Sequence, residues 1–431
     1  KSRQMLHRAK QKNPAALVVA VGCYVQTGRE DVEQDPCIDL AIGNNRKKDL
    51  ASILEEYLQN LEQEDAVAEN AENAGHGVDK TLHDTTVIDI NHTAEYEEMT
   101  LKQTAEHTRA YIKIQDGCNQ FCSYCVIPYA RGRVRSRRAE DIIREITGMA
   151  QNGYREIVLT GIHISSYGID FDEEAWKRGE SVSVLKEDEE RRDYSGSSKL
   201  IDLLERIHTI EGIERIRIGS LEPRIITEET AARMAALPKL CPHFHLSLQS
   251  GCDATLRRMN RKYTSEEYAE SVALLRKVFD HPAITTDVIV GFPGETEEEF
   301  AQTKEFLDRI QFFEMHIFKY SKRAGTRAAV MSHQVPDPVK TTRSAELLAM
   351  EKEQSKQFRT HYVGREAEVL LEETKEIGGM EYLLGHTRDY VKLAVSVKEN
   401  KKNVANTVIC GRVQGFLTDE ILLLSPLEFS K

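Results

Sequence analysis

The stretch from Ile114 to Arg137 reads IQDGCNQFCSYCVIPYARGRVRSR, and it decides how the rest of the chain is interpreted. It contains Cys118, Cys122 and Cys125 in the spacing C-x3-C-x2-C. Cysteine thiolates are the ligands that iron–sulfur clusters and zinc prefer. Three thiolates on a four-iron cluster leave one iron without a protein ligand, and an open iron can bind a small molecule. The spacing therefore predicts a [4Fe–4S] cluster that takes part in chemistry.

Two other interpretations compete for the same cysteines. A zinc knuckle would borrow a fourth ligand from elsewhere, but the usual zinc pattern pairs C-x2-C with a second pair downstream, and none follows here. Three unrelated buried thiols are the other alternative. Their close spacing favours the cluster over both.

The spacing, with the aromatic Tyr124 before the third cysteine, resembles the signature of radical S-adenosylmethionine (SAM) enzymes. The wider run from Gly117 to Arg137 is similar to the methylthiotransferase branch of these enzymes, and most similar to members acting on N6-threonylcarbamoyladenosine beside the anticodon of tRNA. The resemblance covers nearly the whole chain. It implies that SAM chelates the open iron and that one electron from the cluster releases a 5′-deoxyadenosyl radical.

Composition describes an ordinary water-soluble protein. The 431 residues are enough for two or three domains, and 40% are hydrophobic and 30% charged. No apolar run reaches the length of a membrane span, and eight cysteines, three of them clustered, suit a reducing cytoplasm. The net charge of -12 argues only weakly against nucleic acid, because binding depends on local patches.

The amino-terminal part, assigned to residues 1–100, reads as a partial α/β domain with an acidic linker. An expected strand at Leu17–Val21 leads into Gly22-Cys23-Tyr24, which resembles the third cysteine site of the methylthiotransferase amino-terminal domain. In that family three cysteines hold an auxiliary [4Fe–4S] cluster, with Cys23 as one metal ligand. The other two are expected upstream of Lys1, so the chain is expected to be amino-terminally truncated and its auxiliary site incomplete. On its own, Cys23 reads as a small buried hydrophobe.

The rest of this part is predicted from composition. Asp49–Leu61 has the pattern of an amphipathic helix, and Thr86–Ile90 that of a short strand. The region Glu55–Asp79 is acidic and lacks Lys and Arg, which favours a solvated linker or loop.

Residues 104–335 alternate strand and helix patterns, which indicates a parallel sheet. Six units suit an open six-unit (β/α) barrel, the radical SAM core, with an exposed insertion at 171–194. The expected strands are Tyr111–Gln115, Glu156–Thr160, Arg215–Gly219, His243–Leu248, Thr285–Val290 and Phe313–Tyr320. The expected helices are Ala139–Gln151, Leu200–Ile210, Thr264–Val278 and Thr296–Ile310.

The carboxy-terminal part begins with a connecting helix at 336–362, followed by five short strands in 363–428. Short strands with Gly turns predict a small antiparallel β-barrel. Its position and size resemble the TRAM domain, which binds RNA in this family. A capping domain without a ligand is the alternative.

Ligands in parallel (β/α) folds sit at the carboxyl ends of the strands, and the cysteine loop follows the first strand. At successive strand ends or within the strands, the family's motifs imply a SAM pocket. Its cofactor-binding residues would be Tyr124, Gly161, Glu222, Gln249 and Asp287. Taken singly, Glu222 and Gln249 could instead brace loops.

A run of arginines follows the cysteine loop: Arg131, Arg133, Arg135, Arg137 and Arg138. Guanidinium groups bind phosphates through planar paired contacts, so an RNA-binding role is predicted. The alternative is a solvated basic face.

The expected function is the addition of a methylthio group to C2 of N6-threonylcarbamoyladenosine at position 37 of tRNA. The expected partners are tRNA and an electron donor of the flavodoxin or ferredoxin type; the sequence does not identify the sulfur donor. Two rivals are a methylthiotransferase that acts on an Asp of a ribosomal protein and a non-enzymatic iron–sulfur or zinc RNA-binding module. The arginine run disfavours the first, and the open ligand count disfavours the second.

Overall fold

The computed structural model describes residues 2–70, 84–93, 95–99, 108–171, 199–397 and 405–427. Apart from Phe171, the insertion expected at 171–194 lies outside the described residues. The chain forms two compact units. The first comprises the described residues of Lys1–Thr100 with Asp116–Asn119 and Val126–Arg135, and the second comprises the remainder. The cysteine stretch thus contributes to both units.

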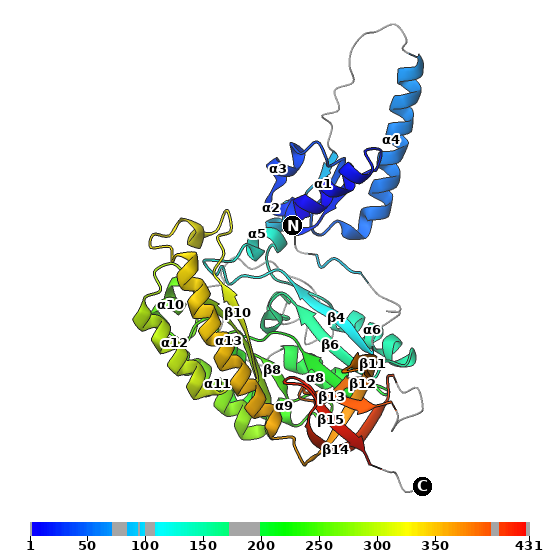
Figure 1. Ribbon diagram of the computed structural model, residues 1–431. Helices are drawn as coiled ribbons and strands as arrows, with labels where there is room; N and C mark the ends of the chain where they lie inside the picture. Colours follow the sequence, from blue (N-terminus) through cyan, green and yellow to red (C-terminus); the bar gives the residue numbers. More distant parts are fainter. Residues whose placement is uncertain are drawn as a thin grey trace. The chain divides into compact units, whose positions relative to one another are not determined.

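The first unit contains the expected α/β arrangement. Its parallel sheet has the order β1 (Val19–Val21), β2 (Leu40–Ile42), β3 (Asp84–Thr86). The helices are α1 (Ser2–Lys12), α2 (Cys23–Thr27), α3 (Arg29–Glu33), α4 (Leu50–Asn70) and α5 (Ile127–Arg131), the first four of which are labelled in blue tones in Figure 1. Short 3-10 turns lie at Lys47–Asp49 and Ile90–His92.

Two expectations for this unit are wrong. The helix α4 continues to Asn70, so the first part of the predicted acidic linker is helical. Its Glu, Leu, Gln and Ala residues are good helix formers, and neither Gly nor Pro interrupts them. The short strand lies at Asp84–Thr86 rather than Thr86–Ile90, because Asp89 caps a 3-10 turn by accepting from the Asn91 N–H.

The second unit is organised around six parallel strands. They are β4 (Arg109–Asp116), β6 (Glu156–Gly161), β7 (Arg215–Ile218), β8 (His243–His245), β9 (Ala283–Val290) and β10 (Glu314–Lys319), with the short β5 (Arg135–Ser136) beside β4. Parallel ladders pair β4 with β6 and β6 with β7 in one half, and β8 with β9 and β9 with β10 in the other. Isolated bridges at Ile216–Leu240 and Leu221–Leu246 connect the two halves. The expected six-unit open barrel is confirmed.

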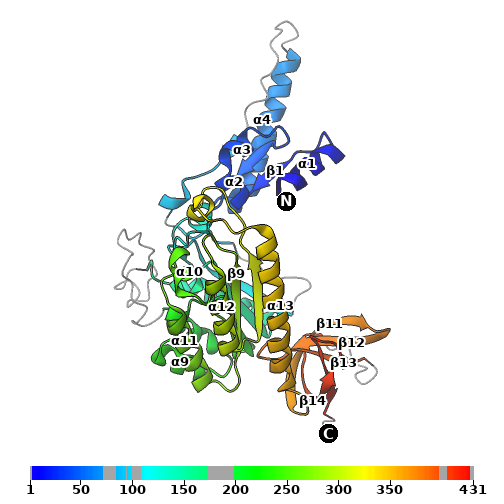
Figure 2. The same cartoon turned by 60° about the vertical axis from the view of Figure 1, so that its left-hand side comes forward.

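Helices cover the outer face of this curved sheet (Figures 1 and 2). They are α6 (Ala139–Gln151), α8 (Lys199–His208), α9 (Glu228–Ala235), α10 (Asp253–Arg258), α11 (Ser265–Val278) and α12 (Glu297–Ile310). Short 3-10 turns lie at Ile164–Ser166, Pro223–Ile225 and Arg327–Val330. The helices α9, α11 and α12 start at threonines that form capping boxes, which satisfy backbone N–H groups at the helix start. One apolar core joins helices and sheet.

The carboxy-terminal elements follow α13 (Asp337–Thr360), which packs along β10. They are β11 (Glu366–Ile377), β12 (Met380–His386), β13 (Lys392–Ser396), β14 (Val408–Phe416) and β15 (Leu422–Pro426). The strands close a barrel in the order β11-β12-β13-β15-β14. The predicted small barrel is confirmed, with one difference: β13 and β15 pair in parallel, while the other neighbours are antiparallel.

Buried arginines fasten this barrel to the sheet within the second unit. Arg217 donates to the carbonyl oxygens of Arg388 and Thr387, each at 2.7 Å, and Arg215 donates to the His386 carbonyl at 2.9 Å. The fully buried Glu156 lies 2.6 Å from the Arg217 Nε. Charge burial therefore fixes one end of the sheet against the barrel. No helix in the described part of the chain has the length and apolarity to cross a membrane.

Candidate functional site

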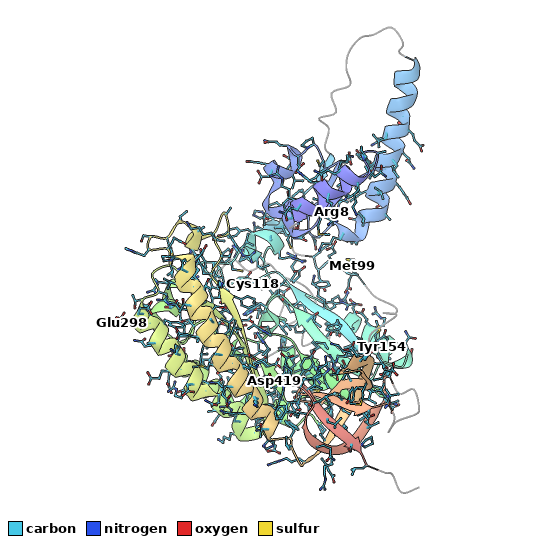
Figure 3. All side chains as sticks on the ribbon, in the orientation of Figure 1. Arg8, Met99, Cys118, Tyr154, Glu298 and Asp419 are labelled. Carbon is cyan, nitrogen blue, oxygen red and sulfur yellow. The ribbon has the colours of Figure 1, made fainter. Side chains whose placement is uncertain are left out.

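The cysteine loop leaves β4 through a glycine that no other residue could replace. Gly117 has φ of 72°, and a Cβ there would lie 1.8 Å from the Arg133 carbonyl oxygen. The next residue, Cys118 (labelled in Figure 3), is buried, and its N–H donates to the Gly132 carbonyl at 3.0 Å. The backbone of the first unit therefore fixes the first cysteine of the motif.

The other two cysteines of the motif belong to the second unit. The Cys125 N–H donates to the Cys122 carbonyl at 3.0 Å, and between them the Ser123 hydroxyl donates to the Arg258 carbonyl at 2.8 Å. The Arg261 guanidinium donates to the Cys122 Sγ at 3.4 Å. Every cysteine of the chain is free of disulfide bonds. Free cysteines are the ligands that an iron–sulfur cluster requires.

Tyr124 lies between these cysteines. Its ring meets Phe292 edge-on, with centroids 6.3 Å apart. Burial raises the pKa of the Tyr124 phenol well above its usual range, so the phenol stays neutral at physiological pH. The aromatic residue of the motif thus contributes apolar packing under the cysteine loop.

At the end of β6, Gly161 allows a close approach between two strands. A Cβ at Gly161 would lie 3.1 Å from the Gln115 Oε1. That oxygen accepts from the N–H groups of Ile162 at 3.0 Å and His163 at 2.8 Å. The buried Gln115 amide therefore holds the loop after β6 against the end of β4.

Glu222, after β7, is an acid whose pKa is strongly lowered by its surroundings. Its Oε2 lies 3.0 Å from the His163 Nε2 and 3.2 Å from the Gln120 Nε2. Burial opposes ionisation, but the hydrogen bond with His163 and the charges of His163 and Arg261 outweigh it and lower the Glu222 pKa to about 2. Glu222 is therefore an anion at neutral pH.

Gln249 and Asp287 are in contact through their backbones. Gln249 has φ of 72°, an unusual conformation for a residue other than glycine, and its N–H donates to the Asp287 carbonyl at 2.8 Å. The side chain of Asp287 lies within β9, not at its end, with its Oδ2 3.4 Å from the His245 Nε2. The structure therefore groups the Asp287 carboxylate with histidines rather than with Glu222.

Sequence reasoning missed three residues of this site: Gln115, His163 and Arg261. His163 stands two positions after Gly161, so its place just beyond a strand end could have marked it as a candidate site residue. Gln115 ends a strand that was itself predicted, but the sequence did not indicate that its side chain is buried and accepts from the loop after β6. Arg261 follows a short helix that was not predicted, and nothing in its local sequence indicates contact with Cys122.

Cys23 begins α2 in the first unit. The Asn44 Nδ2 donates to its Sγ at 3.4 Å and to the Ala130 carbonyl at 2.6 Å. Asn44 is buried, so its amide fixes the thiol relative to α5.

The arginine run is only partly exposed. Arg135 is buried, with its Nη2 3.9 Å from the Asp116 Oδ2, and Arg137 is buried in an ion pair with Glu145. A buried, paired guanidinium does not reach a phosphate at the surface, so the expectation for these two residues needs correction. Arg131 and Arg133 are partly exposed and Arg138 is exposed.

Comparisons with known proteins agree with this geometry. Residues 112–307 match the model of the Radical SAM superfamily, so the chain is a radical SAM enzyme, whose superfamily uses a [4Fe–4S] cluster and SAM. The chain is 35% identical to threonylcarbamoyladenosine tRNA methylthiotransferase MtaB of Bacillus subtilis over 401 aligned residues. The alignment covers 93% of this chain and 79% of that protein. It belongs to the family of radical SAM tRNA methylthiotransferases.

Other relatives bear related names. The enzyme of the same name from Aquifex aeolicus is 36% identical, over 87% of this chain and 81% of that protein. A tRNA-2-methylthio-N(6)-dimethylallyladenosine synthase of Thermoanaerobacter is 36% identical, over 84% of this chain and 68% of that protein. Among solved structures, coproporphyrinogen III oxidase of Escherichia coli aligns with a TM-score of 0.38 and 16% identity, over 58% of this chain and 53% of that one.

Proposed function

We propose that the protein adds a methylthio group to C2 of N6-threonylcarbamoyladenosine at position 37 of tRNA, beside the anticodon. The observation that carries this proposal is the 35% identity, over 93% of the chain, to a Bacillus subtilis enzyme whose name specifies threonylcarbamoyladenosine. The motif from Gly117 to Arg137 supports the same branch of the family.

In this proposal Cys118, Cys122 and Cys125 ligate three irons of the radical SAM cluster. When bound, the cluster supplies the electron that cleaves SAM and yields a 5′-deoxyadenosyl radical. Arg261 positions Cys122 for this role, since its guanidinium donates to the Sγ at 3.4 Å. The C2–H bond of adenine carries no acidic proton, so acid–base groups offer no route to it and the pocket's task is to bind and orient.

Gly161, Glu222 and Gln249 are proposed to line the SAM pocket. Gly161 keeps the strand end open because it has no side chain, and the anionic Glu222 accepts from N–H or O–H groups of the cofactor. His163 holds the Glu222 carboxylate in place through the contact at 3.0 Å. Tyr124 keeps the loop packed and excludes water beside the cysteines.

For tRNA, we propose that Arg131, Arg133 and Arg138 contact phosphates, because these are the members of the run with exposed surface. The carboxy-terminal barrel is proposed as a second RNA contact, on its resemblance to the TRAM domain. A small electron-transfer protein of the flavodoxin or ferredoxin type is the proposed reductant.

The similarity to a dimethylallyladenosine synthase favours a second candidate, the same reaction on N6-dimethylallyladenosine. Nucleoside mass spectrometry of tRNA from a deletion strain separates the two. We expect the methylthio form of threonylcarbamoyladenosine to disappear and the unmethylthiolated form to accumulate. Loss of the methylthio form of the dimethylallyl nucleoside would select the second candidate, and loss of neither would refute both.

A further inference from the structure

Three adjacent strands of the second unit bring a carboxylate between two imidazoles. His245 comes from β8, Asp287 from β9 and His316 from β10, and one possible ligand atom of each lies within 4.8 Å of the others. The strand register explains this proximity, because His316 stands directly opposite Asp287 and His245 stands opposite Thr285. The two imidazole rings have centroids 5.8 Å apart at an angle of 27°.

The hydrogen bonds of these side chains leave ligand atoms available. The His245 Nδ1 lies 3.0 Å from the Thr285 Oγ1, and in the tautomer with Nδ1–H donating, Nε2 turns a lone pair toward Asp287. Within the described ranges, no N–H or O–H group within hydrogen-bonding geometry donates to the Asp287 carboxylate, and the His316 ring makes no hydrogen bond. In that tautomer the imidazole lone pair faces the carboxylate at 3.4 Å, and a cation bound by both groups would offset their repulsion.

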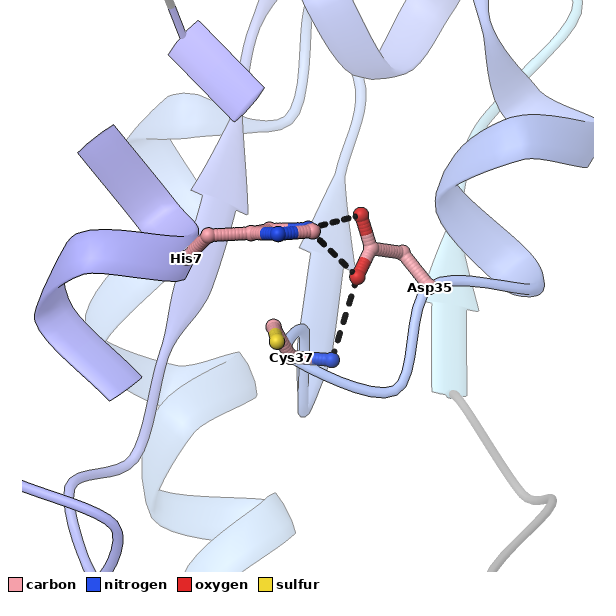
Figure 4. Close-up of side chains that lie close together, drawn as sticks. All are labelled: His7, Asp35 and Cys37. Atoms are coloured by element: carbon pink, nitrogen blue, oxygen red, sulfur yellow. Dashed lines mark hydrogen bonds and ion pairs between the residues drawn. The ribbon is translucent and has the colours of Figure 1, made fainter. Parts of the chain in front are cut away.

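A second group of potential metal ligands lies in the first unit, but its carboxylate is already occupied by hydrogen bonds. Figure 4 shows the buried Asp35 carboxylate accepting from the His7 Nε2, at 2.7 and 2.9 Å, and from the Cys37 N–H at 3.1 Å. The Arg3 Nε also lies 3.2 Å from the Asp35 Oδ2. Those contacts already satisfy the carboxylate and fasten α1 to the loop before β2, so this group forms an internal ion pair and is not a candidate.

We propose that His245, Asp287 and His316 bind a divalent transition-metal ion through two imidazole nitrogens and a carboxylate oxygen. Imidazole and carboxylate ligands suit such ions, and a hydroxyl on the second ring nitrogen of a ligand histidine fixes its orientation. Asp287 is partly exposed and His316 is exposed, so an ion can enter from solvent. Three protein ligands leave further positions for water or another oxygen ligand. None of the three residues is a cysteine of the radical SAM motif.

Mn²⁺ binding to protein with a reconstituted, oxidised cluster tests this site. The probe is Mn²⁺ because it favours oxygen ligands such as the Asp287 carboxylate over the chain's thiolates, and the EPR signal of free Mn²⁺ falls as the ion binds. We expect one ion per chain in the unaltered protein. His316→Ala and Asp287→Asn should each weaken binding on the order of tenfold or more, since each removes a ligand.

His7→Ala is the matched control, because it removes the histidine of the other potential ligand group and should leave Mn²⁺ binding unchanged. His316 is exposed, so its alanine variant should fold and retain the cluster absorbance even where Asp287→Asn does not. The proposal is overturned if His316→Ala binds Mn²⁺ as tightly as the unaltered protein. It is equally overturned if the unaltered protein binds none, in which case His245 and Asp287 form only an ion pair.

Discussion

Replacing Glu156 with Gln should destabilise the second unit strongly. Glu156 is fully buried, and its Oε1 lies 2.7 Å from the Arg109 Nε and 2.6 Å from the Arg217 Nε. Both guanidinium groups are themselves buried. Gln keeps the shape but removes the charge, which leaves the buried Arg217 without the acid at its Nε and Arg109 with Glu372 alone. Removing one partner of a buried ion pair costs about 3–5 kcal/mol of unfolding free energy.

Urea unfolding followed by circular dichroism measures this cost as a shift in midpoint. The control is Glu214→Gln, which removes an acid that lies 3.4 Å from Arg155 with both side chains roughly half exposed. Loss of such a surface pair should cost about 0–1 kcal/mol. If Glu156→Gln costs no more than Glu214→Gln, the buried charges do not fasten the carboxy-terminal barrel as inferred.

Three further predictions concern the proposed site. Alanine at any one cysteine of the motif should abolish formation of 5′-deoxyadenosine from SAM, because a cluster ligand is lost, and measurable product would contradict the ligand assignment. The Glu222 carboxylate has a pKa lowered from 4.5 to about 2, so its contribution to stability is present above pH 4.5 and disappears as pH falls toward 2. Glu222→Gln should therefore flatten the acid side of the stability profile in urea unfolding, by up to about 3 kcal/mol, and an unchanged profile would disprove this. The double variant Arg133→Glu with Arg138→Glu should weaken tRNA binding and flatten the plot of log affinity against log salt, whereas Arg309→Glu on α12 should not; equal slopes would exclude the phosphate contacts.

The regular parts of the fold were readable from sequence because their signals are local. Strand patterns such as Glu156–Thr160 and the helix Ala139–Gln151 have the period and the boundaries of their element. The helices α9 and α10 have 8 and 6 residues, too few for a helical period to stand out. For α4, acidity was taken as evidence of a loop, although acidity describes exposure and helix propensity describes backbone conformation.

The candidate site was predictable to the extent that the strand ends carry it. Glu222 was identified because it follows a predicted strand and matches a motif of the resembled family, but its partners His163 and Gln120 come from loops after two other strands. Such contacts depend on how strands are ordered in the sheet, and the sequence reveals that order only through topology rules. The same limit applies to Asp287, whose position opposite His316 follows from register and not from any motif.

The arginine run shows what charge density in a sequence leaves undetermined. Arg131 and Arg135 both approach the Asp116 carboxylate, at 3.5 and 3.9 Å, and Asp116 directly precedes the glycine that opens the cysteine loop. A buried guanidinium beside an acid stabilises the local structure, whereas a guanidinium with exposed surface can also reach a phosphate. The sequence does not distinguish these two environments. Because Arg135 is buried against Asp116, its charge organises the segment that carries Cys118. The run therefore joins two structural roles, in which Arg135 holds the segment that carries Cys118 and Arg137 is buried in an ion pair with Glu145.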